Sequence, residues 1–232
     1  MSLGDDLHAQ VVEIFKREWT KRNGQVVPES ADLGLSNDAV AFDAATVLYA
    51  DISDSTKLVN DYPWNFAAEI YKAFLLCAAK VISDEGGVIT AYDGDRVMAV
   101  FIGNSKNTSA AQTALKINYC VQNLVNPALK AQYPDRAYQV RHVVGADVSS
   151  VRVARTGIRG SNDLVWVGRA ANYAAKLCAL PDMFPSYITA DVYNALADSA
   201  KFSDGRPMWE QATWNSMGGF KIYRSTWWWK VS

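Results

Sequence analysis

The sequence predicts an α+β fold, a sandwich related to the ferredoxin-like motif in which helices cover one face of a mostly antiparallel sheet. Two observations lead to this class. The chain has 232 residues, of which 50% are hydrophobic and 20% charged, enough for one sizeable core because domains usually have about 100–200 residues. From residue 45 onward, segments follow the order strand, helix, hairpin, helix, hairpin, strand, helix. We therefore expect an N-terminal helical extension and linker over residues 1–40 and one main domain over residues 41–232.

The first forty residues differ in pattern from the rest. Leu7, Val11 and Ile14 recur at helical spacing among charges, whereas residues 21–40 are polar and loop-like. This pattern predicts an amphipathic helix on a tether. Its apolar stripe either packs on its own domain, which is the commoner use of such a stripe, or is exchanged with a partner chain.

The main domain opens with its clearest strand. Residues 46–52 form a β-branched, apolar run that carries Asp51 near its end, which is typical of a central strand with a functional tip. A long helix is predicted from about Tyr62 to Ser83, and Gly86 with Gly87 forms its C-terminal stop. Two strands then flank an Asp-Gly-Asp-Arg turn, which is a hairpin signature because Asp and Gly tolerate positive φ.

The remaining elements follow from the same periodicities. The predicted ranges are strands at 88–92 and 97–102, a helix at 108–125, strands at 138–148, 151–154 and 164–167, and a helix at 170–180. The Trp227-Trp228-Trp229 triplet near the C-terminus predicts a last strand whose rings pack under the N-terminal helix or on a dimer partner.

Charge and composition exclude several classes of partner. Lys and Arg number 23 against 24 Asp and Glu, a net charge of −1, so no global basic field exists to bind a nucleic acid polymer or an anionic membrane. No apolar run reaches the length of a membrane span, and the acidic start lacks the order of a signal peptide. Three cysteines in helical stretches indicate buried thiols. We expect a soluble, cytoplasmic protein.

Two acids stand at predicted strand tips. Asp51 lies near the end of the first strand, and Asp95 sits in the first hairpin turn. If these elements are neighbours, both carboxylates project from one edge of the sheet and can share divalent cations with a backbone carbonyl and substrate phosphate oxygens. The alternative is structural, because Asp-Gly-Asp is a common turn and an Asp after a strand is often a helix cap.

A second group of polar residues lies on the last predicted helix. Asn172 and Lys176 are four residues apart, so the amide and the ammonium face the same way. An amide can orient a ribose, and a lysine can neutralise charge that grows on a phosphoryl oxygen. The alternative is an ordinary solvated helix face.

Three motifs together resemble those of class III nucleotidyl cyclases. Residues 49–56, Tyr-Ala-Asp-Ile-Ser-Asp-Ser-Thr, resemble the F-A-D-I-x-x-F/S-T strand and turn of that family. Residues 94–101 are similar to its G-D-x-x-M-A-x-F hairpin, and residues 167–176 resemble its W-G-x-x-V-N-x-A-x-R helix. The resemblance covers roughly residues 45–225.

The resemblance implies a homodimer with two head-to-tail active sites. Asp51, Asp95 and the carbonyl of Ile52 would hold two Mg²⁺ or Mn²⁺ ions, and the second subunit would supply its Asn172 and Lys176. The 3′-hydroxyl of a nucleoside triphosphate would attack its own α-phosphate and release pyrophosphate. The product would be a 3′,5′-cyclic nucleotide.

Departures from the family pattern concern the base. The positions that read a purine in adenylyl and guanylyl cyclases are Ala91 and Val165 here, and neither side chain can make a hydrogen bond. Each polar group of the base that is left without a hydrogen-bond partner costs about 1–3 kcal/mol of binding free energy. A purine substrate is therefore disfavoured.

Further departures concern the phosphates. Lys176 replaces the family's transition-state Arg, which keeps the charge but loses the planar fork. Met217 replaces the lysine of a phosphate-binding Lys-Gly pair, so Lys221 would have to take that role. Arg141 lies two residues before the usual strand Arg, and strand alternation keeps it on the same face.

The pattern as a whole is most similar to the pyrimidine cyclases of bacterial Pycsar antiphage systems. These make cyclic UMP or cyclic CMP, which acts on a separate effector. Overall similarity favours UTP, although no single residue distinguishes uracil from cytosine. Tyr49, Tyr92, Trp166 and Arg96 are candidates for contacting the base because they lie near the motifs.

Three alternatives stay open at this point. One is a cytidylate cyclase or an adenylate cyclase with unusual base contacts. Another is a catalytically silent cyclase-like domain that binds nucleotide and regulates a partner, suggested by Lys176 and Met217. A diguanylate cyclase is disfavoured because the hairpin lacks a G-G-D/E-E-F-like run.

Overall fold

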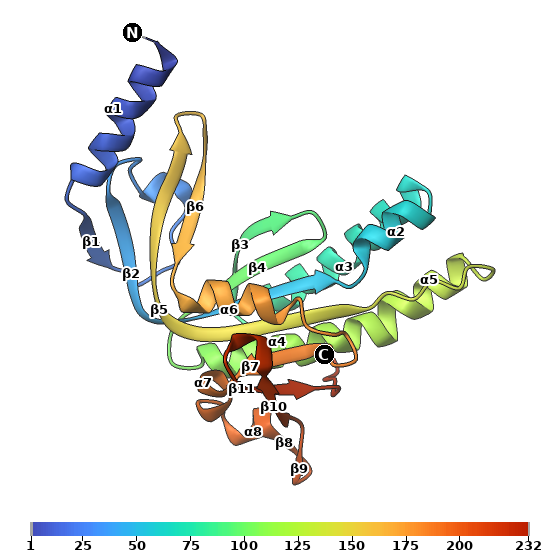
Figure 1. Ribbon diagram of the computed structural model, residues 1–232. Coiled ribbons are helices and arrows are strands. Elements are labelled where there is room, and N and C mark those ends of the chain that lie inside the picture. Colours follow the sequence, from blue (N-terminus) through green and yellow to red (C-terminus); the bar gives the residue numbers. More distant parts are fainter. Residues whose placement is uncertain (1, 232) are drawn as a thin grey trace.

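The computed structural model describes residues 2–231 and is built around one nine-stranded sheet (Figure 1). The strand order is β10-β11-β7-β5-β2-β4-β3, with β1 beside β2 and β6 beside β5. The strands are β1 Thr20–Asn23, β2 Asp38–Ile52, β3 Val88–Asp93, β4 Arg96–Phe101, β5 His142–Ile158, β6 Ser161–Val167, β7 Ser186–Thr189, β10 Glu210–Trp214 and β11 Phe220–Ser225. A small second sheet pairs β8 Phe202–Ser203 with β9 Arg206–Pro207.

The helices connect these strands and cover the sheet. They are α1 Leu3–Lys16, α2 Ser55–Asp61, α3 Trp64–Asp84, α4 Lys106–Cys120, α5 Asn126–Gln132, α6 Arg169–Leu177, α7 Ala190–Asn194 and α8 Asp198–Lys201, with a π-helical turn at Val121–Val125. Short 3₁₀ turns occur at Ser30–Asp32 and Asn215–Met217. Across residues 2–231, no helix is both long and apolar enough to cross a membrane.

The sheet is mostly antiparallel, as the sequence predicts. The central strand β2 pairs antiparallel with both β4 and β5. Parallel pairing is limited to β1 with β2 and β5 with β7 among the described strands. The predicted α+β class is therefore confirmed.

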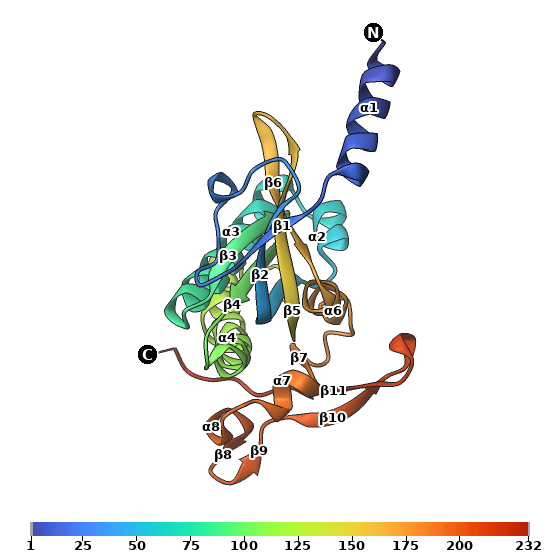
Figure 2. The same ribbon diagram turned by 90° about the vertical axis from the view of Figure 1, so that its left-hand side faces the viewer.

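Both faces of the sheet carry helices, so the prediction of helices on one face is wrong. Alternate residues of β2 point to opposite sides: Leu48 and Ala50 join the core under α3 and α4, whereas Val47 joins the cluster under α6. Figure 2 shows α6 on one side of the sheet and α3 with α4 on the other. The sequence pattern conceals this layer because α6 buries mainly alanines instead of a stripe of large apolar residues.

A glycine allows α6 to approach the sheet closely. A Cβ atom at Gly145 of β5 would clash with the carbonyl oxygen of Ala174 and crowd the side chain of Leu177. The buried residues of α6 that face β5 and β2 are small, namely Ala170, Ala171 and Ala174. The helix therefore packs directly on the backbone of β5.

Several predicted boundaries are wrong for local reasons. The helix predicted from Tyr62 to Ser83 is confirmed as α3 but begins at Trp64, because Pro63, which lacks an N–H, sits at its N-cap, and a separate short helix, α2, precedes it. The strands predicted at 138–148 and 151–154 are one continuous strand, β5, which forms its hairpin with β6. Within the predicted loop 21–40, residues 21–23 belong to β1.

The C-terminal tryptophans do not form the predicted strand. They run as an extended segment over α4, where Trp229 N donates to Leu115 O at 3.1 Å and Asn118 Nδ2 donates to Trp227 O at 2.8 Å. Trp227 and Trp229 pack on the core under α3 and α4. The prediction that they lie under the N-terminal helix is therefore wrong.

A buried ion pair fixes the start of α6. Asp147 of β5 is fully buried and receives Arg169 Nε at 3.0 Å on Oδ2 and Thr189 Oγ1 at 2.6 Å on Oδ1. The Arg169 guanidinium also donates to Val148 O at 2.8 Å and reaches Asp191. The first residue of α6 is thereby attached to β5 and, through Thr189, to β7.

Replacing Arg169 with alanine should destabilise the fold. The change leaves Asp147 buried without its cation, and the loss of one member of a buried pair costs about 3 kcal/mol. Urea denaturation of the purified variant measures this loss. As a matched control, Asp191→Asn removes only the half-exposed partner of the same guanidinium and should cost less than about 1 kcal/mol. Equal losses in the two variants would contradict the assignment.

Candidate active site

The structure brings the two predicted metal acids to one edge of the sheet. In the antiparallel register, Ala50 of β2 pairs with Val97 of β4, which places Asp51 beside the start of β4. Asp95 lies in the turn between β3 and β4, where Gly94 adopts a φ of 61°. The turn therefore holds Asp95 next to the end of β2.

The Asp51 carboxyl is partly buried and lies near the negative charge of Asp95. Burial, and secondly the negative charge of Asp95, raise the pKa of Asp51 to about 6. Arg96 offsets part of this effect, with its Nε 4.0 Å from Asp51 Oδ2. Its guanidinium is shared, because Nη2 also lies 3.5 Å from Asp93 Oδ2. The site therefore lacks a full positive counter-charge of its own.

The donor set at this edge fits divalent cations. Asp95 Oδ2 is buried and has no hydrogen-bond partner among the described residues, although buried oxygens are normally paired. No group of three or more His, Cys, Asp or Glu side chains gathers anywhere in residues 2–231. Two carboxylates with the backbone carbonyl of the adjacent Ile52 form the kind of all-oxygen, incomplete set that hard cations share with phosphate.

Tyr49 lies on the same face of β2, two residues before Asp51. The Arg96 guanidinium lies over its ring, 5.6 Å from the ring centre. Its carbonyl accepts a hydrogen bond from Cys178 Sγ at 2.9 Å. Cys178 directly follows α6 and is buried, as predicted, so this contact attaches the end of α6 to β2 near the acids.

Asn172 and Lys176 are both exposed on the outer face of α6, as their spacing predicts. Lys176 Nζ lies 3.6 Å from Met217 Sδ, in the turn between β10 and β11. Among the described residues, no hydrogen bond or salt bridge joins either side chain to Asp51 or Asp95. Within one chain, neither kind of bond therefore connects the two halves of the predicted site.

The positions predicted to face the base are apolar and lie on different strands. Ala91 of β3 is partly buried and packs on the cluster under α6, as Tyr49 and Trp166 do. Val165 of β6 is exposed and alternates with the less exposed Trp166. Neither position places a hydrogen-bonding side chain at the site.

The two predicted phosphate-binding cations have different surroundings. Arg141 precedes β5, and its Nη2 donates to Asp54 at 2.7 Å while Nη1 donates to Asp182 at 3.3 Å. Its carbonyl accepts from Ser53 N at 2.9 Å, so Arg141 borders the turn that follows β2. Lys221 of β11 is exposed and pairs with Thr213 of β10.

Sequence reasoning missed three residues at this edge. Asp54 and Asp182 both hold Arg141, although they lie 87 and 41 residues from it in the chain. Burial, and secondly the charge of Asp95, raise the pKa of Tyr71 of α3, so this phenol lies near the acids. Asp54 sits inside the first motif, which was a usable signal, whereas nothing local marks Tyr71 or Asp182.

Solved structures show the same fold. The chain is similar to guanylyl cyclase Cya2, with a TM-score of 0.68 and 15% identity over 81% of this chain and 93% of that one. It is also similar to adenylyl cyclase CyaB from P. aeruginosa, with a TM-score of 0.65 and 17% identity over 81% of this chain and 95% of that one. The expected class III cyclase fold is thus confirmed.

Sequence relatives are much closer. A uridylate cyclase of Burkholderia cepacia is 55% identical over 232 residues and one of Xanthomonas perforans is 51% identical, each along the full length of both chains. A uridylate cyclase of Rhodovulum sp. (strain MB263) is 37% identical over 98% of each chain. No family model matches the chain.

The raised pKa of Asp51 predicts a pH dependence. The folded state holds this proton more tightly than the unfolded state, where the pKa is near 3.8. The contribution of Asp51 to the free energy of unfolding is therefore fully present below about pH 4 and is lost as the pH rises through about 6.

Urea denaturation of metal-free protein measures this effect. The stability of wild type relative to Asp51→Asn should fall as the pH rises from about 4 to 7. The control is Asp204→Asn, a change in the exposed turn between β8 and β9. The stability of wild type relative to this variant should depend less on pH. A difference between wild type and Asp51→Asn that does not change with pH would contradict the assignment. A divalent cation that binds to Asp51 would compete with its proton, so any such binding should weaken below about pH 6.

Proposed function

The chain belongs to the uridylate cyclase family, whose curated members match it along nearly all of its length, and on that premise we propose that it converts UTP to 3′,5′-cyclic UMP and pyrophosphate. The observation that carries the proposal is the meeting of Asp51 and Asp95 at one sheet edge, with a buried carboxylate oxygen that lacks a partner. Cytidylate cyclase activity is not favoured, because the full-length relatives share the uridylate name.

Asp51, Asp95 and the carbonyl of Ile52 are the residues that would hold Mg²⁺ or Mn²⁺, two ions per site. Such ions neutralise phosphate charge and activate both ends of an in-line displacement at phosphorus. The burial that raises the pKa of Asp51 keeps this carboxyl partly protonated near pH 6, so a cation has a site with unmet negative charge only above that pH.

We assign Asn172 and Lys176 to the active site of a second subunit in a homodimer. Both are exposed on α6, and among the described residues no hydrogen bond or salt bridge joins them to the acids of their own chain. The amide would orient the ribose so that its 3′-oxygen faces the α-phosphate, and the ammonium would stabilise charge on the phosphoryl oxygens. We assign Arg141 and Lys221 to binding the phosphates. To do so, Arg141 must break its hydrogen bond to Asp54 or to Asp182 and form one with the substrate.

The base would meet a surface with few hydrogen-bonding groups. Ala91 and Val165 cannot form hydrogen bonds with the edge of a purine. Each hydrogen bond left unmade weakens the binding of a purine by about 1–3 kcal/mol. Tyr49, with Arg96 over its ring, is a side chain on this face that can stack on a small base.

We also propose that the cyclic product is a second messenger for a separate effector in antiphage defence. This role follows the resemblance to the Pycsar cyclases and the identity with curated uridylate cyclases. Expression with a neighbouring effector gene should protect cells from phage, and the Asp51→Ala variant should not.

Purified protein with Mn²⁺ should form pyrophosphate and a cyclic product chiefly from UTP when the four ribonucleoside triphosphates are compared. Asp51→Ala and Asp95→Ala should each lower the rate at least about 100-fold, because each removes a metal ligand. Asp93→Ala is the matched control, since this acid lies in the same turn but is 83% exposed, and it should stay within a few-fold of wild type. Turnover of ATP alone would refute the substrate assignment.

Mixing two inactive variants tests the shared active site. Asp51→Ala combined with Lys176→Ala should recover about a quarter of wild-type activity, because half of the dimers are mixed and each has one intact site of two. Asn172→Ala combined with Lys176→Ala should recover nothing, since every mixed site still carries one defect. Equal behaviour of the two mixtures would place the whole site within one subunit.

A further inference from the structure

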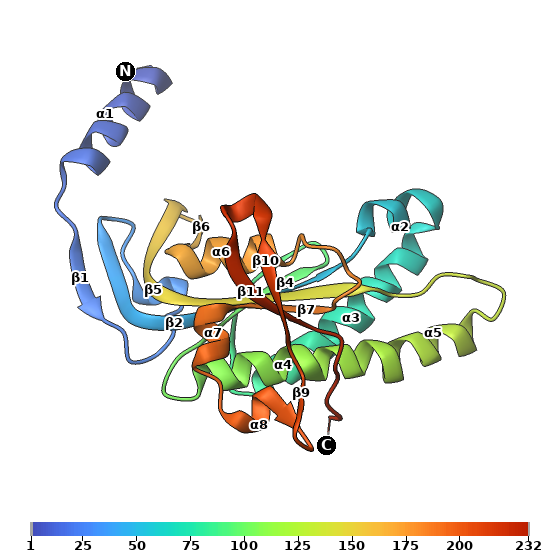
Figure 3. The same cartoon turned by 60° about the horizontal axis from the view of Figure 1, so that its bottom comes forward.

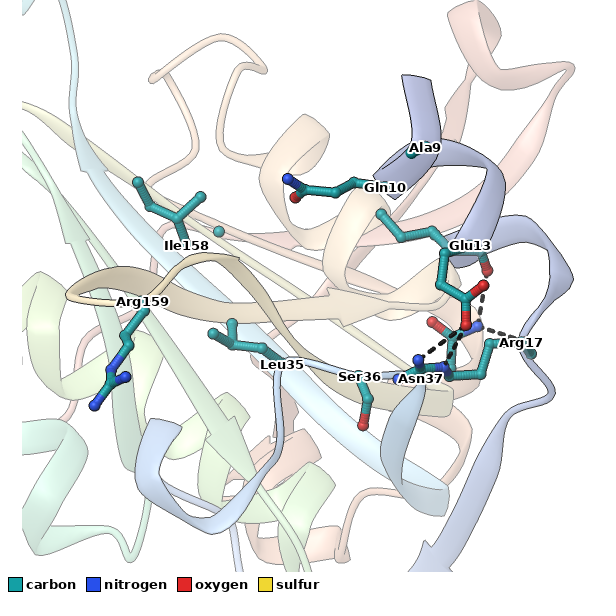
Figure 4. Close-up of a pocket in the computed structure, with 11 residues that line it drawn as sticks. Ala9, Gln10, Glu13, Arg17, Leu35, Ser36, Asn37, Ile158 and Arg159 are labelled. Atoms are coloured by element: carbon teal, nitrogen blue, oxygen red, sulfur yellow. Dashed lines mark hydrogen bonds and ion pairs between the residues drawn. The ribbon is translucent and has the colours of Figure 1, made fainter. Parts of the chain in front are cut away.

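A groove of about 530 Å³ separates α1 from the tip of the β5–β6 hairpin (Figure 4). Ile14 lines this groove, but no residue of α1 is buried, so the prediction that the apolar stripe packs on its own domain is wrong. Arg17 pairs with Glu13 at 2.9 Å, and Asn37 Nδ2 donates to Ile14 O and Arg17 O. These polar groups already have partners, so the groove gives no reason to assign a ligand there.

Two cysteines on adjacent helices form another feature outside the active site. Cys77 lies on α3, and Cys120 is the last residue of α4. Figures 2 and 3 both show α3 and α4 on the same side of the sheet, and the two helices contact each other. Cys120 is buried in the core between the helices and the sheet, whereas Cys77 is only partly buried against that core. The prediction of buried thiols is therefore confirmed for Cys120 and wrong for Cys77.

Contacts on both sides of the cysteines fix how the helices are aligned. Lys116 of α4 forms a salt bridge at 3.4 Å with Asp84, the last residue of α3. Tyr133, directly after α5, donates its hydroxyl to Glu69 Oε2 at 2.5 Å, near the start of α3. The segment from α4 to α5 therefore runs antiparallel to α3, and both cysteines lie between these two contacts.

The two thiols interact directly. The Cys120 thiol donates a hydrogen bond to the Cys77 sulfur, which lowers the pKa of Cys77 to about 7. The same hydrogen bond, together with burial, raises the pKa of Cys120. At neutral pH, Cys77 is therefore partly thiolate, which is the form that reacts with oxidants. Redox-sensitive cysteines commonly have this arrangement, an accessible thiol of low pKa beside a second thiol.

The surroundings favour thiol oxidation over metal binding. A structural zinc ion needs four ligands, and no group of three or more His, Cys, Asp or Glu side chains gathers within residues 2–231. A π-helical turn, Val121–Val125, begins directly after Cys120, and such turns often lie at functional sites.

The third cysteine has a different environment. Cys178 is buried, and its Sγ donates to the carbonyl oxygens of Tyr49 at 2.9 Å and Val143 at 3.4 Å. Burial raises the pKa of this thiol. Cys178 is therefore protected from oxidants and serves as an internal control.

From these observations we infer that Cys77 and Cys120 form a redox site, at which a peroxide converts the two thiols to a disulfide that links α3 to α4. The Cys77 thiolate attacks one oxygen of hydrogen peroxide, the O–O bond breaks, and the hydroxide that leaves takes up a proton to become water. Cys77 is then a sulfenic acid. The Cys120 sulfur loses its proton and attacks the Cys77 sulfur, the S–O bond breaks, and a second hydroxide leaves as water. The two sulfurs together lose two electrons, and one peroxide is reduced to two waters.

Thiol counting and peptide mass spectrometry of the full chain test this site. The protein is treated with hydrogen peroxide, the excess peroxide is removed, and the chain is unfolded in an alkylating agent. Wild type should keep one free thiol of its three, and the peptides that contain Cys77 and Cys120 should be joined. Cys178 should be fully alkylated. Three free thiols, a disulfide that includes Cys178, or a link between two chains would overturn the inference.

The pH profile of alkylation tests the contact between the thiols. In wild type, the rate at which iodoacetamide alkylates Cys77 should be half-maximal at about pH 7, whereas in Cys120→Ala the midpoint should move to about pH 9, the ordinary value for a thiol. Alanine is small, apolar and favourable in a helix, so this variant should fold, and circular dichroism checks this. Identical profiles for the two proteins would show that the thiols do not interact.

Thermal unfolding tests whether the bond links the two helices. Oxidised wild type should melt at least about 5 °C higher than reduced wild type, because the disulfide constrains the unfolded chain. A dithiol reductant should reverse the rise. Cys77→Ala is the matched control, and peroxide should leave its melting temperature within about 1 °C. A rise of the same size in Cys77→Ala would contradict the link between Cys77 and Cys120.

Discussion

The close approach of two carboxylates at the end of β2 is the constraint on which the rest of the site depends. Burial opposes the ionisation of Asp51, and the nearby negative charge of Asp95 adds to this effect, so the pKa of Asp51 rises to about 6. The β2–β4 register and a turn with a glycine at positive φ hold the two carboxylates in place. The fold keeps this pair although Asp51 contributes nothing to the stability of the protein above that pH. Because Arg96 offsets this repulsion only in part, the pair is suited to the cations that we propose it binds.

Local periodicity predicted the elements that carry the acids. The first strand is recognisable because apolar alternation runs into an acid, and the hairpin is recognisable because Asp and Gly permit its turn. The outward direction of Asn172 and Lys176 also follows from helical spacing alone. These features depend on residues close in the chain, which a single sequence displays directly.

Long-range packing was not visible in the same way. The unbroken course of β5 was missed because the partly exposed Ser149 and the exposed Ser150 look like a turn, yet the strand continues through them. The second helical layer was missed because α6 buries alanines. The engagement of Arg141 by Asp182 and the direction of Tyr71 depend on elements that meet only in the folded chain. Part of the site therefore became known only with the coordinates.

The close contact between Gly145 and α6 has a consequence for how sequences of this kind can diverge. Because peptide atoms of β5 touch the helix directly, the height of Asn172 and Lys176 above the sheet is set by main-chain geometry, which substitution cannot enlarge or shrink. Core residues on the other face of the sheet, beneath α3 and α4, can be substituted without moving the amide of Asn172 or the ammonium of Lys176. A larger residue at Gly145, or at the alanines of α6 that face it, would lift the helix, so these small residues limit variation more than their size suggests.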